Sequence, residues 1–163
     1  MNPAVALAAL AGLAAAPTTA RAAPDREIIV HGFRAPSTGV ELREGVIGFH
    51  VGFYPTTLDK APDGDDRTTW FLKTGLTVYF LGFDLGSGRD SSPYVGLSLV
   101  QGLGNEWDVS KSTTTGAGGT FEAGFRWAVY EGLDLRLGAS LLAGFDGRTR
   151  VRPTPGISWA VPY

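Results

Sequence analysis

The chain has 163 residues, which is enough for one domain, with a formal net charge of −2 and no cysteine. The lack of cysteine excludes a disulfide framework, a thiolate metal site and a cysteine nucleophile. The net charge is too small to favour a phosphate backbone, so we expect no nucleic-acid partner.

Residues 1–22 have the pattern of a cleavable signal peptide. An unbroken apolar run covers residues 4–16, and the Ala-Arg-Ala sequence at 20–22 fits the small-x-small cleavage rule. The first three residues contain no Lys or Arg, which departs from the usual leader. We predict a signal peptide over 1–22 and a mature domain over 23–163; the alternative is an Ala-rich helix of a soluble protein. No other stretch of the sequence is apolar for the ~18 residues that a transmembrane helix needs.

The mature chain begins with four segments that we predict to be extended. Apolar residues recur at every second position, which is the period of a β-strand with one apolar face. In the third segment Phe49 and Val51 take the apolar face, and His50 takes the opposite one. The Glu-Gly pair at 44–45 suits a tight turn, and residues 55–67 are predicted to form a polar loop. The segments are 27–33, 38–44, 46–54 and 69–81.

Four more extended segments follow, and the alternation is strongest toward the end of the chain. Between 133 and 145 every odd position is apolar. A Glu-Gly pair at 131–132 joins this run to the preceding one and suits a tight hairpin. We predict a connection at 82–92, a long polar loop at 104–119 and another loop at 146–155. The four segments are 93–103, 121–130, 133–145 and 156–163.

The length of these segments indicates the fold class. Strands of soluble domains usually have about 5–6 residues, whereas these runs approach the ~9–11 residues with which a tilted strand crosses a bilayer. Charged residues inside the runs exclude a helical membrane span. We therefore predict an all-β fold: a single antiparallel up-and-down transmembrane β-barrel of about eight strands.

Loop lengths orient the predicted barrel. The turns after the second and sixth segments are short, and the loops after the third, fifth and seventh are long. Outer-membrane barrels have short periplasmic turns and long outer loops, so Tyr163 is expected on the periplasmic side. The connection at 82–92 is long for a periplasmic turn and does not fit this rule.

The last predicted strand carries a more specific signal. Ile157, Trp159, Val161 and Tyr163 share one face, and the chain stops on the aromatic residue. In this it resembles the small eight-stranded outer-membrane β-barrels of Gram-negative bacteria, whose terminal aromatic strand is presented to the barrel-insertion machinery. The resemblance implies a porin-like monomer in the bacterial outer membrane. Its partners would be the lipid bilayer, lipopolysaccharide and the insertion machinery, and no subfamily is identified.

The faces opposite the apolar ones carry the charged residues. An eight-stranded barrel has an interior that side chains just fill, and buried charges must be paired. We predict that Glu122 pairs with Arg126 or Arg136, and that Asp134 pairs with Arg126. The alternative is a proton or ion path. The predicted polar network of the lumen contains Glu41, Arg43, His50, Lys73, Glu122, Arg126, Asp134 and Arg136.

Residues near the ends of the strands suggest surface roles. Arg148, Arg150 and Arg152 either contact lipopolysaccharide phosphates or keep a loop in water. The acidic stretch at 63–66 either binds a divalent cation or is a solvated loop. Aromatic residues fit membrane-interface girdles and the C-terminal signal; these are Trp70, Trp127, Trp159 and Tyr163.

We interpret the chain as a structural or surface-interaction barrel with no catalytic, cofactor-binding or metal-binding residues. One alternative is a lipid-modifying barrel enzyme similar to the lipid A deacylases, which use a His, a Ser and a carboxylate. The residue two after His50 is Gly52 and offers no nucleophile, whereas His31, Ser37 and Glu41 would need a particular loop fold to meet. The other alternative is a soluble lipocalin-like barrel, whose apolar faces would point inward.

Overall fold

The computed structural model describes residues 26–34, 37–60, 66–103, 117–144 and 149–163. Within these ranges side chains are described except at residues 34, 37, 54–60, 66–69, 144 and 150. The strands of this part are β1 (Arg26–Arg34), β2 (Ser37–Glu44), β3 (Ile47–Lys60), β4 (Asp66–Tyr79), β5 (Phe83–Asp84), β6 (Asp90–Gly102), β7 (Ala117–Tyr130), β8 (Leu133–Gly144), β9 (Thr149–Pro153) and β10 (Gly156–Pro162). The signal peptide predicted at 1–22 lies outside the described residues.

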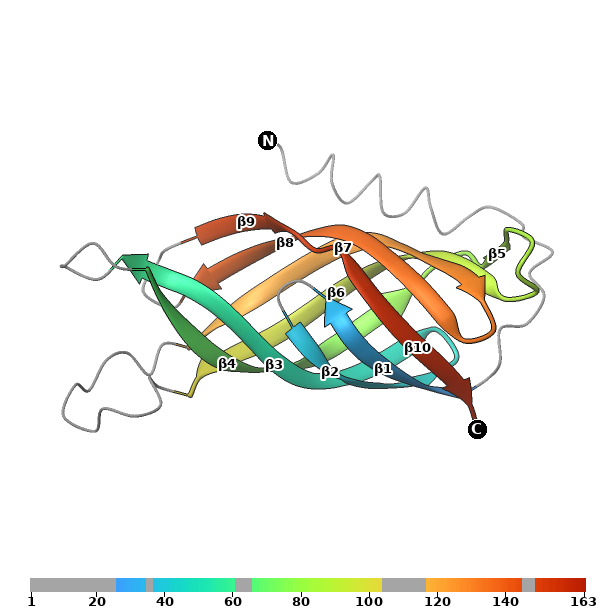
Figure 1. The fold of residues 1–163 in the computed structure, drawn as a ribbon, viewed down its shortest axis with the longest axis horizontal. Coiled ribbons are helices and arrows are strands. Elements are labelled where there is room, and N and C mark those ends of the chain that lie inside the picture. Colours follow the sequence, from blue (N-terminus) through green and yellow to red (C-terminus); the bar gives the residue numbers. More distant parts are fainter. Residues whose placement is uncertain (1–25, 35–36, 61–65, 104–116, 145–148) are drawn as a thin grey trace.

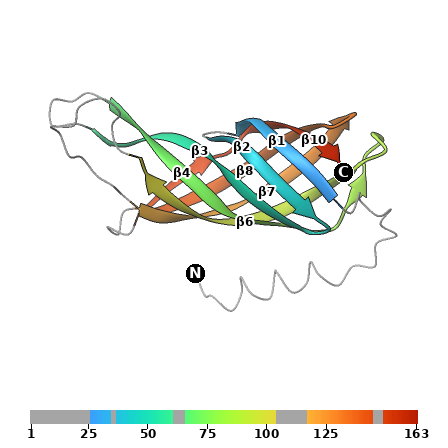
Figure 2. The same ribbon diagram turned by 90° about the horizontal axis from the view of Figure 1, so that it is seen from below.

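The strands close into a barrel (Figures 1 and 2). Every pairing is antiparallel, and from β1 to β9 each strand pairs with the next one in the chain, except for β5, a two-residue addition to β6. β10 pairs with β8 on one side and with β1 on the other, which completes the ring. β9 and β10 both run along β8 and together form the eighth wall strand. The predicted all-β, eight-stranded antiparallel barrel is therefore confirmed as a fold.

The two ends of the barrel differ in their connections. At one end, called the turn end, tight turns join β2 to β3 and β7 to β8, and Tyr163 lies there too. Gly45 and Gly132 in these turns have φ of 59° and 85°, which glycine adopts without strain. At the opposite loop end, β3, β6 and β8 connect to their successors through 61–65, 104–116 and 145–148, which are outside the described part.

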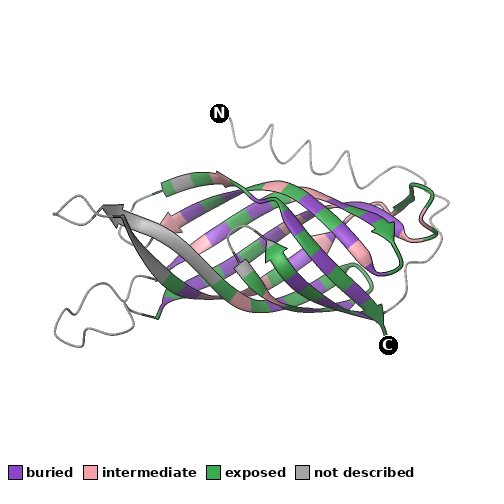
Figure 3. Ribbon diagram, in the orientation of Figure 1, coloured by how far each residue is buried: buried purple, intermediate pink, exposed green. Residues whose placement is uncertain are grey.

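Buried and exposed residues alternate along the strands of the wall, as predicted (Figure 3). On β8, Leu135 and Leu137 are 41% and 54% exposed, whereas Asp134 and Arg136 between them are 0% and 3% exposed. On β3, Phe49 is 50% exposed. The pleat of each strand thus places apolar side chains outside the barrel and polar ones inside it.

The hairpin formed by β3 and β4 is longer than the sequence prediction. Residues 55–67 were expected to form a loop, but β3 continues to Lys60 and β4 starts at Asp66. In the backbone register of this extension, Thr56 is opposite Thr69 and Thr57 is opposite Thr68. Threonine is β-branched and favours strands, so the extension keeps strand geometry without the apolar alternation on which the prediction relied.

Two other predicted connections also contain strand. The loop expected at 146–155 includes β9, which pairs with β8 from Ala139 to Ala143. The connection expected at 82–92 contains β5 and the start of β6. Its turn is ordered by Asp84, whose Oδ1 accepts hydrogen bonds from the backbone N–H of Gly86 at 2.8 Å and of Gly88 at 3.1 Å.

The interior of the barrel changes in character along its length. Toward the loop end, Phe71, Val100 and Leu142 form a buried apolar cluster. From the middle to the turn end, buried polar and charged side chains fill the space. The hydrophobic core of this protein is therefore small, and its interior consists mainly of polar contacts.

Candidate functional site

The structure places all eight residues of the predicted lumen network inside the barrel. Each is at most 4% exposed. They come from five strands, β2, β3, β4, β7 and β8. Their contacts can be described as three groups. The most exposed cation of the network, Arg89, was not among the predicted residues, and its side chain is 17% exposed.

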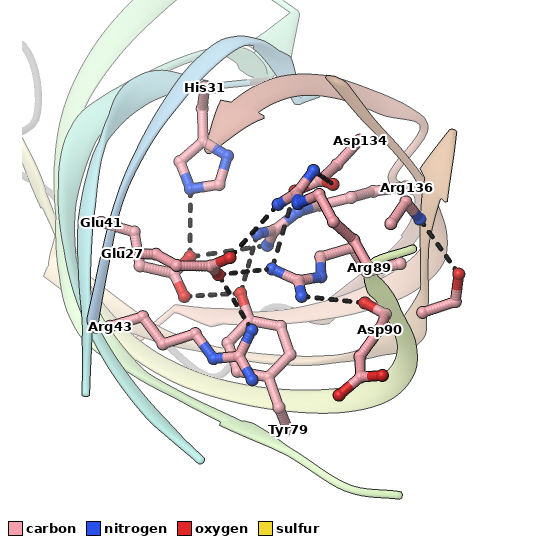
Figure 4. A network of polar contacts seen from close by, with 12 residues as sticks. Glu27, His31, Glu41, Arg43, Tyr79, Arg89, Asp90, Asp134 and Arg136 are labelled. Carbon is pink, nitrogen blue, oxygen red and sulfur yellow. Dashed lines mark hydrogen bonds and ion pairs between the residues drawn. The ribbon is translucent and has the colours of Figure 1, made fainter. Parts of the chain in front are cut away.

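The first group is centred on Glu27 near the turn end (Figure 4). Three guanidinium groups contact this one carboxylate, which is 1% exposed. Arg43 Nη1 and Arg126 Nη1 lie 3.0 and 3.1 Å from Oε2, and Arg89 Nη2 lies 3.2 Å from Oε1. Glu27 thereby joins β1, β2 and β7 to the connection between β5 and β6.

Arg89 extends this group to a second carboxylate. Its Nη1 lies 3.0 Å from Asp134 Oδ1, so one guanidinium bridges Glu27 on β1 and Asp134 on β8. Arg126 is 3.6 Å from Asp134 Oδ2 and donates a hydrogen bond to the backbone carbonyl of Asp90 at 3.1 Å. The long connection that did not fit the turn rule therefore supplies a side chain that fills the turn-end mouth of the barrel.

The second group is built around Glu41 and Tyr79. Glu41 contacts His31 Nε2 at 3.1 Å and Arg136 Nη1 at 3.5 Å, and it accepts a hydrogen bond from the Tyr79 hydroxyl. Arg136 Nη2 donates to that same hydroxyl at 2.7 Å. The Tyr79 ring also lies under the guanidinium carbons of Arg43, at 4.6 Å from its centroid, and of Arg126, at 5.0 Å. These cation–π contacts connect the second group to the first.

The third group lies on the strands from β3 to β7. Lys73 Nζ is 3.2 Å from Glu122 Oε2, and Tyr94 donates to Glu122 Oε1 at 2.7 Å. Beside them His50 is held between two hydroxyls, with Nδ1 at 3.1 Å from Thr77 and Nε2 at 2.9 Å from Ser98. His50 thus ties three neighbouring strands together.

The charges from the middle of the barrel to its turn end balance. Five buried carboxylates face five cations, and the formal sum is zero when both histidines are neutral. Neutrality matters because an uncompensated charge inside a protein is costly. The carboxylates are Glu27, Glu41, Asp90, Glu122 and Asp134, and the cations are Arg43, Lys73, Arg89, Arg126 and Arg136.

The pairs differ in part from those expected from the sequence. The expected contact of Asp134 with Arg126 is present at 3.6 Å. The partners that the structure gives Glu122 are Lys73 and Tyr94, on other strands of the wall. Glu27 was missed because Ile28 and Ile29 are both apolar and obscure the alternation of β1. The signal available in the sequence was its spacing of four residues from His31, which places both polar side chains on the same face of an extended strand.

The two histidines considered as catalytic residues are buried inside the barrel, where they contact other side chains. His31 and Glu41 meet, whereas the side chain of Ser37 is outside the described part. His50 does meet a serine, but Ser98 is 4% exposed and lies within the barrel interior. In the described residues no group of three or more His, Asp or Glu side chains is arranged to hold a metal ion.

The predicted interface residues lie on the outside of the wall. Trp127, Trp159 and Tyr163 are 37%, 48% and 64% exposed toward the turn end, and Trp70 is 41% exposed toward the loop end. Of the remaining predicted surface residues, Arg152 lies in β9 and is half-buried. Arg148 and the acidic residues 63–65 lie outside the described part.

Comparison with known proteins gives no relative. No protein-family model matches the chain, and no curated protein or solved structure matches it significantly. Within the described ranges, no helix has the length and apolar character to cross a membrane. The class defined by the structure is therefore a closed eight-stranded antiparallel β-barrel with a charged interior and an apolar exterior.

Proposed function

We propose that this protein is an integral β-barrel of a bacterial outer membrane, with a structural or surface-interaction role and a lumen filled by side chains. The main support for this proposal is that polar side chains lie inside the barrel and apolar side chains lie outside it, the reverse of the arrangement in a soluble protein. Balanced ion pairs occupy the interior, while aliphatic and aromatic side chains cover the outside of the wall. A bilayer is the solvent that suits this arrangement, since lipid favours an apolar outer surface on a closed barrel.

The apolar exterior argues against the soluble lipocalin-like alternative. In such a barrel the apolar faces would point inward to hold a ligand. Here Phe49, Leu97, Leu137 and Val161 are each between 47% and 68% exposed, on four different strands. Contiguous apolar surface of this extent is rare on soluble monomers, because each Å² left in water costs about 25 cal/mol.

The ends of the barrel support an orientation for the proposed membrane protein. The turn end carries Trp127, Tyr130, Trp159 and Tyr163 on the outer face, as expected of an interfacial aromatic girdle. Short turns are typical of the periplasmic side, and long loops of the outer side. The loop end would then meet lipopolysaccharide and any surface partner.

The filled interior favours a role without catalysis or conduction. Both histidines are engaged in buried contacts, and the ion pairs near the turn end occupy the cross-section that a pore would need. The lipid-modifying enzyme alternative would need a histidine on the outer face, whereas His31 and His50 are both buried. We therefore place the function at the outer surface and loop end of the barrel.

The location is tested by fractionating cells that express the full chain. We expect the protein in outer membranes after carbonate extraction, and an unboiled band that migrates as a compact, heat-modifiable species. The physical reason is that a closed barrel resists detergent until heat breaks its backbone ladder. A soluble periplasmic protein of known location is the control. Recovery of the protein in the same soluble fraction would overturn the proposal.

A substitution at Tyr163 tests the proposed recognition of β10 by the insertion machinery. Tyr163→Asp is expected to lower the heat-modifiable fraction severalfold, because it puts a charge on the outward aromatic stripe of β10. Tyr130→Asp is the matched control, since Tyr130 is a similarly exposed aromatic at the turn end, 61% against 64%. Equal loss in the two variants would mean that both residues act only as interface anchors.

A further inference from the structure

The connection between β4 and β6 lies at the turn end of the barrel (Figures 1 and 2). The pairing of β4 with β6 ends at Tyr79, and β5 pairs with β6 again from Phe83. Leu81 lies between the two pairings and has a φ of 40°, a left-handed conformation that leucine rarely adopts. Such strain persists where the surrounding structure holds it, and it is often found at segments that switch. We call residues 82–89, which follow Leu81, the turn-end lid.

The last residue of the turn-end lid reaches across the mouth of the barrel (Figure 4). In the ring of eight wall strands, β1 is four places from β6 in either direction, so these two strands are opposite each other. Arg89 Nη2 nevertheless lies 3.2 Å from Glu27 Oε1 on β1. Its Nη1 lies 3.0 Å from Asp134 Oδ1 on β8. One guanidinium therefore spans the opening and contacts carboxylates of two distant strands.

The tip of the turn-end lid has few other attachments to the barrel. In the described part of the chain, the hydrogen bonds of residues 83–88 have their partners within the same connection and the start of β6. Phe83 and Leu85 are 40% and 61% exposed, so apolar burial contributes little to holding the tip. The ion pairs of Arg89 are therefore the main contacts that fix the tip over the mouth.

The base of the connection is attached separately, to β7. Arg126 Nη2 donates to the backbone carbonyl of Asp90 at 3.1 Å, and the N–H of Ala128 donates to Ser91 Oγ at 3.1 Å. Asp90 and Ser91 are both buried and belong to β6, outside the turn-end lid. These contacts do not involve Arg89, so the base keeps them when Arg89 leaves its carboxylates. The tip is thus able to move while the base stays in place.

We propose that the turn-end lid opens and closes over the mouth of the folded barrel, with Leu81 as its hinge and Arg89 as its latch. Opening withdraws one guanidinium and admits water and small solutes to the polar interior from the turn end. The buried apolar cluster toward the loop end stays packed, so an open lid gives access to the interior without forming a pore. This inference goes beyond the proposed function and rests on the barrel alone, because the lid needs no membrane to move.

A single introduced cysteine reports on the lid, because the chain has no cysteine of its own. Ser92 is two residues beyond Asp90 and 2% exposed, and its hydroxyl has no hydrogen-bond partner in the described structure. Ser92→Cys therefore removes no hydrogen bond. Methyl methanethiosulfonate, a small neutral thiol reagent, is added to the full protein folded in detergent micelles, where both ends of the barrel meet water. Mass spectrometry follows the adduct, and we expect slow labelling that reports the fraction of time for which the lid is open.

Two latch variants and a control test the role of Arg89. In the Ser92→Cys background, Arg89→Gln should raise the labelling rate by at least about tenfold, because charge-assisted hydrogen bonds hold the lid shut. Arg89→Lys keeps the charge but lacks the planar fork that contacts both carboxylates, so it should also accelerate labelling. Arg26→Gln is the matched control and should leave the rate unchanged. It removes an arginine from the same end, but the ion pair of Arg26 with Glu44 is exposed.

A second reporter distinguishes lid opening from a general loosening of the barrel. Ser140 lies four residues beyond Arg136 on β8, is 3% exposed, and its hydroxyl also has no partner in the described structure. Labelling of Ser140→Cys should stay slow in both Arg89 variants, and the heat-modifiable band should be retained. Equal acceleration at positions 92 and 140 would overturn the proposal, because the whole barrel would then be looser. A rate at position 92 that ignores Arg89→Gln, or that Arg89→Lys leaves unchanged, would contradict a latch that bridges two carboxylates.

Discussion

Replacing Leu137 with arginine is expected to lower the free energy of unfolding from lipid vesicles by about 2–4 kcal/mol, the cost of a cation on the lipid face near the bilayer midplane. Leu137 is 54% exposed and lies near the middle of β8, between the inward-facing positions of Arg136 and Gly138. Urea titration of the refolded protein, followed by tryptophan fluorescence, measures the change.

Gln101→Arg is the matched control for this prediction. Gln101 is also exposed on the outer face, but it is the second-to-last residue of β6, close to the loop end. Arginine near an interface costs only about 0–1 kcal/mol, so the two variants should differ clearly. If the outer face met water, both substitutions would change stability by less than about 0.5 kcal/mol. Equal and small effects would therefore contradict the membrane proposal itself.

Removing Arg126 is the second change with a large expected effect. Arg126→Met leaves the carboxylate of Glu27 with one guanidinium fewer and gives the interior an unbalanced negative charge. Breaking a buried ion pair in this way costs about 3–5 kcal/mol. Adding Glu27→Gln restores neutrality, so the double variant should be more stable than the sum of the single effects predicts. A double-mutant cycle in urea measures this coupling.

The Glu122→Gln variant tests whether coupling to Arg126 comes from direct contact or from the net charge of the interior. It removes the same formal charge as Glu27→Gln, but the partners of Glu122 are Lys73 and Tyr94. We expect Arg126→Met and Glu122→Gln to be nearly additive, because Glu122 contacts Lys73 and Tyr94, whereas the carboxylates that contact Arg126 belong to Glu27 and Asp134. Strong coupling between positions 122 and 126 would show that net interior charge, and not direct contact, determines stability. Additivity between positions 27 and 126 would contradict the described network.

The faces of the strands could be predicted from the sequence because a wall with apolar and polar sides imposes a period of two. This periodicity alone predicts Leu137 on the outside and Arg136 on the inside. It also predicts His50 on the inside, since Phe49 and Val51 beside it are apolar. A rule that applies to every residue of a strand needs no knowledge of which strands are neighbours.

The interactions inside the barrel could not be predicted in the same way. The contact of Arg89 with Glu27 and Asp134 depends on how a connection folds over the turn-end mouth, and no periodicity describes that. The choice of Lys73 as the partner of Glu122 depends on the three-dimensional curvature of the wall. Local alternation identifies inward residues, but only closure of the barrel decides which of them meet.

The sequence prediction placed the ends of strands wrongly where a polar sequence nevertheless forms a strand. β9 carries arginines and a proline, and the far part of the β3–β4 hairpin carries threonines and charges. Both are strands because β8 and the hairpin partner supply backbone hydrogen bonds, whatever the side chains are. An alternating apolar pattern identifies strand residues where one face of the strand contacts an apolar medium or core. It does not identify strand residues where both faces are polar.

The pairing of β1 with β10 has a consequence for how the chain reaches its native state. β1 can acquire its second neighbour only after β10, the last described strand, has been synthesised. The ion pair of Glu27 with Arg126 likewise joins residues 99 positions apart. Such distant contacts raise the contact order and slow folding, because loop entropy must be lost before the contacts form. Until then the two edge strands remain open to aggregation, so we expect the chain to be most prone to aggregate while its two ends are still apart.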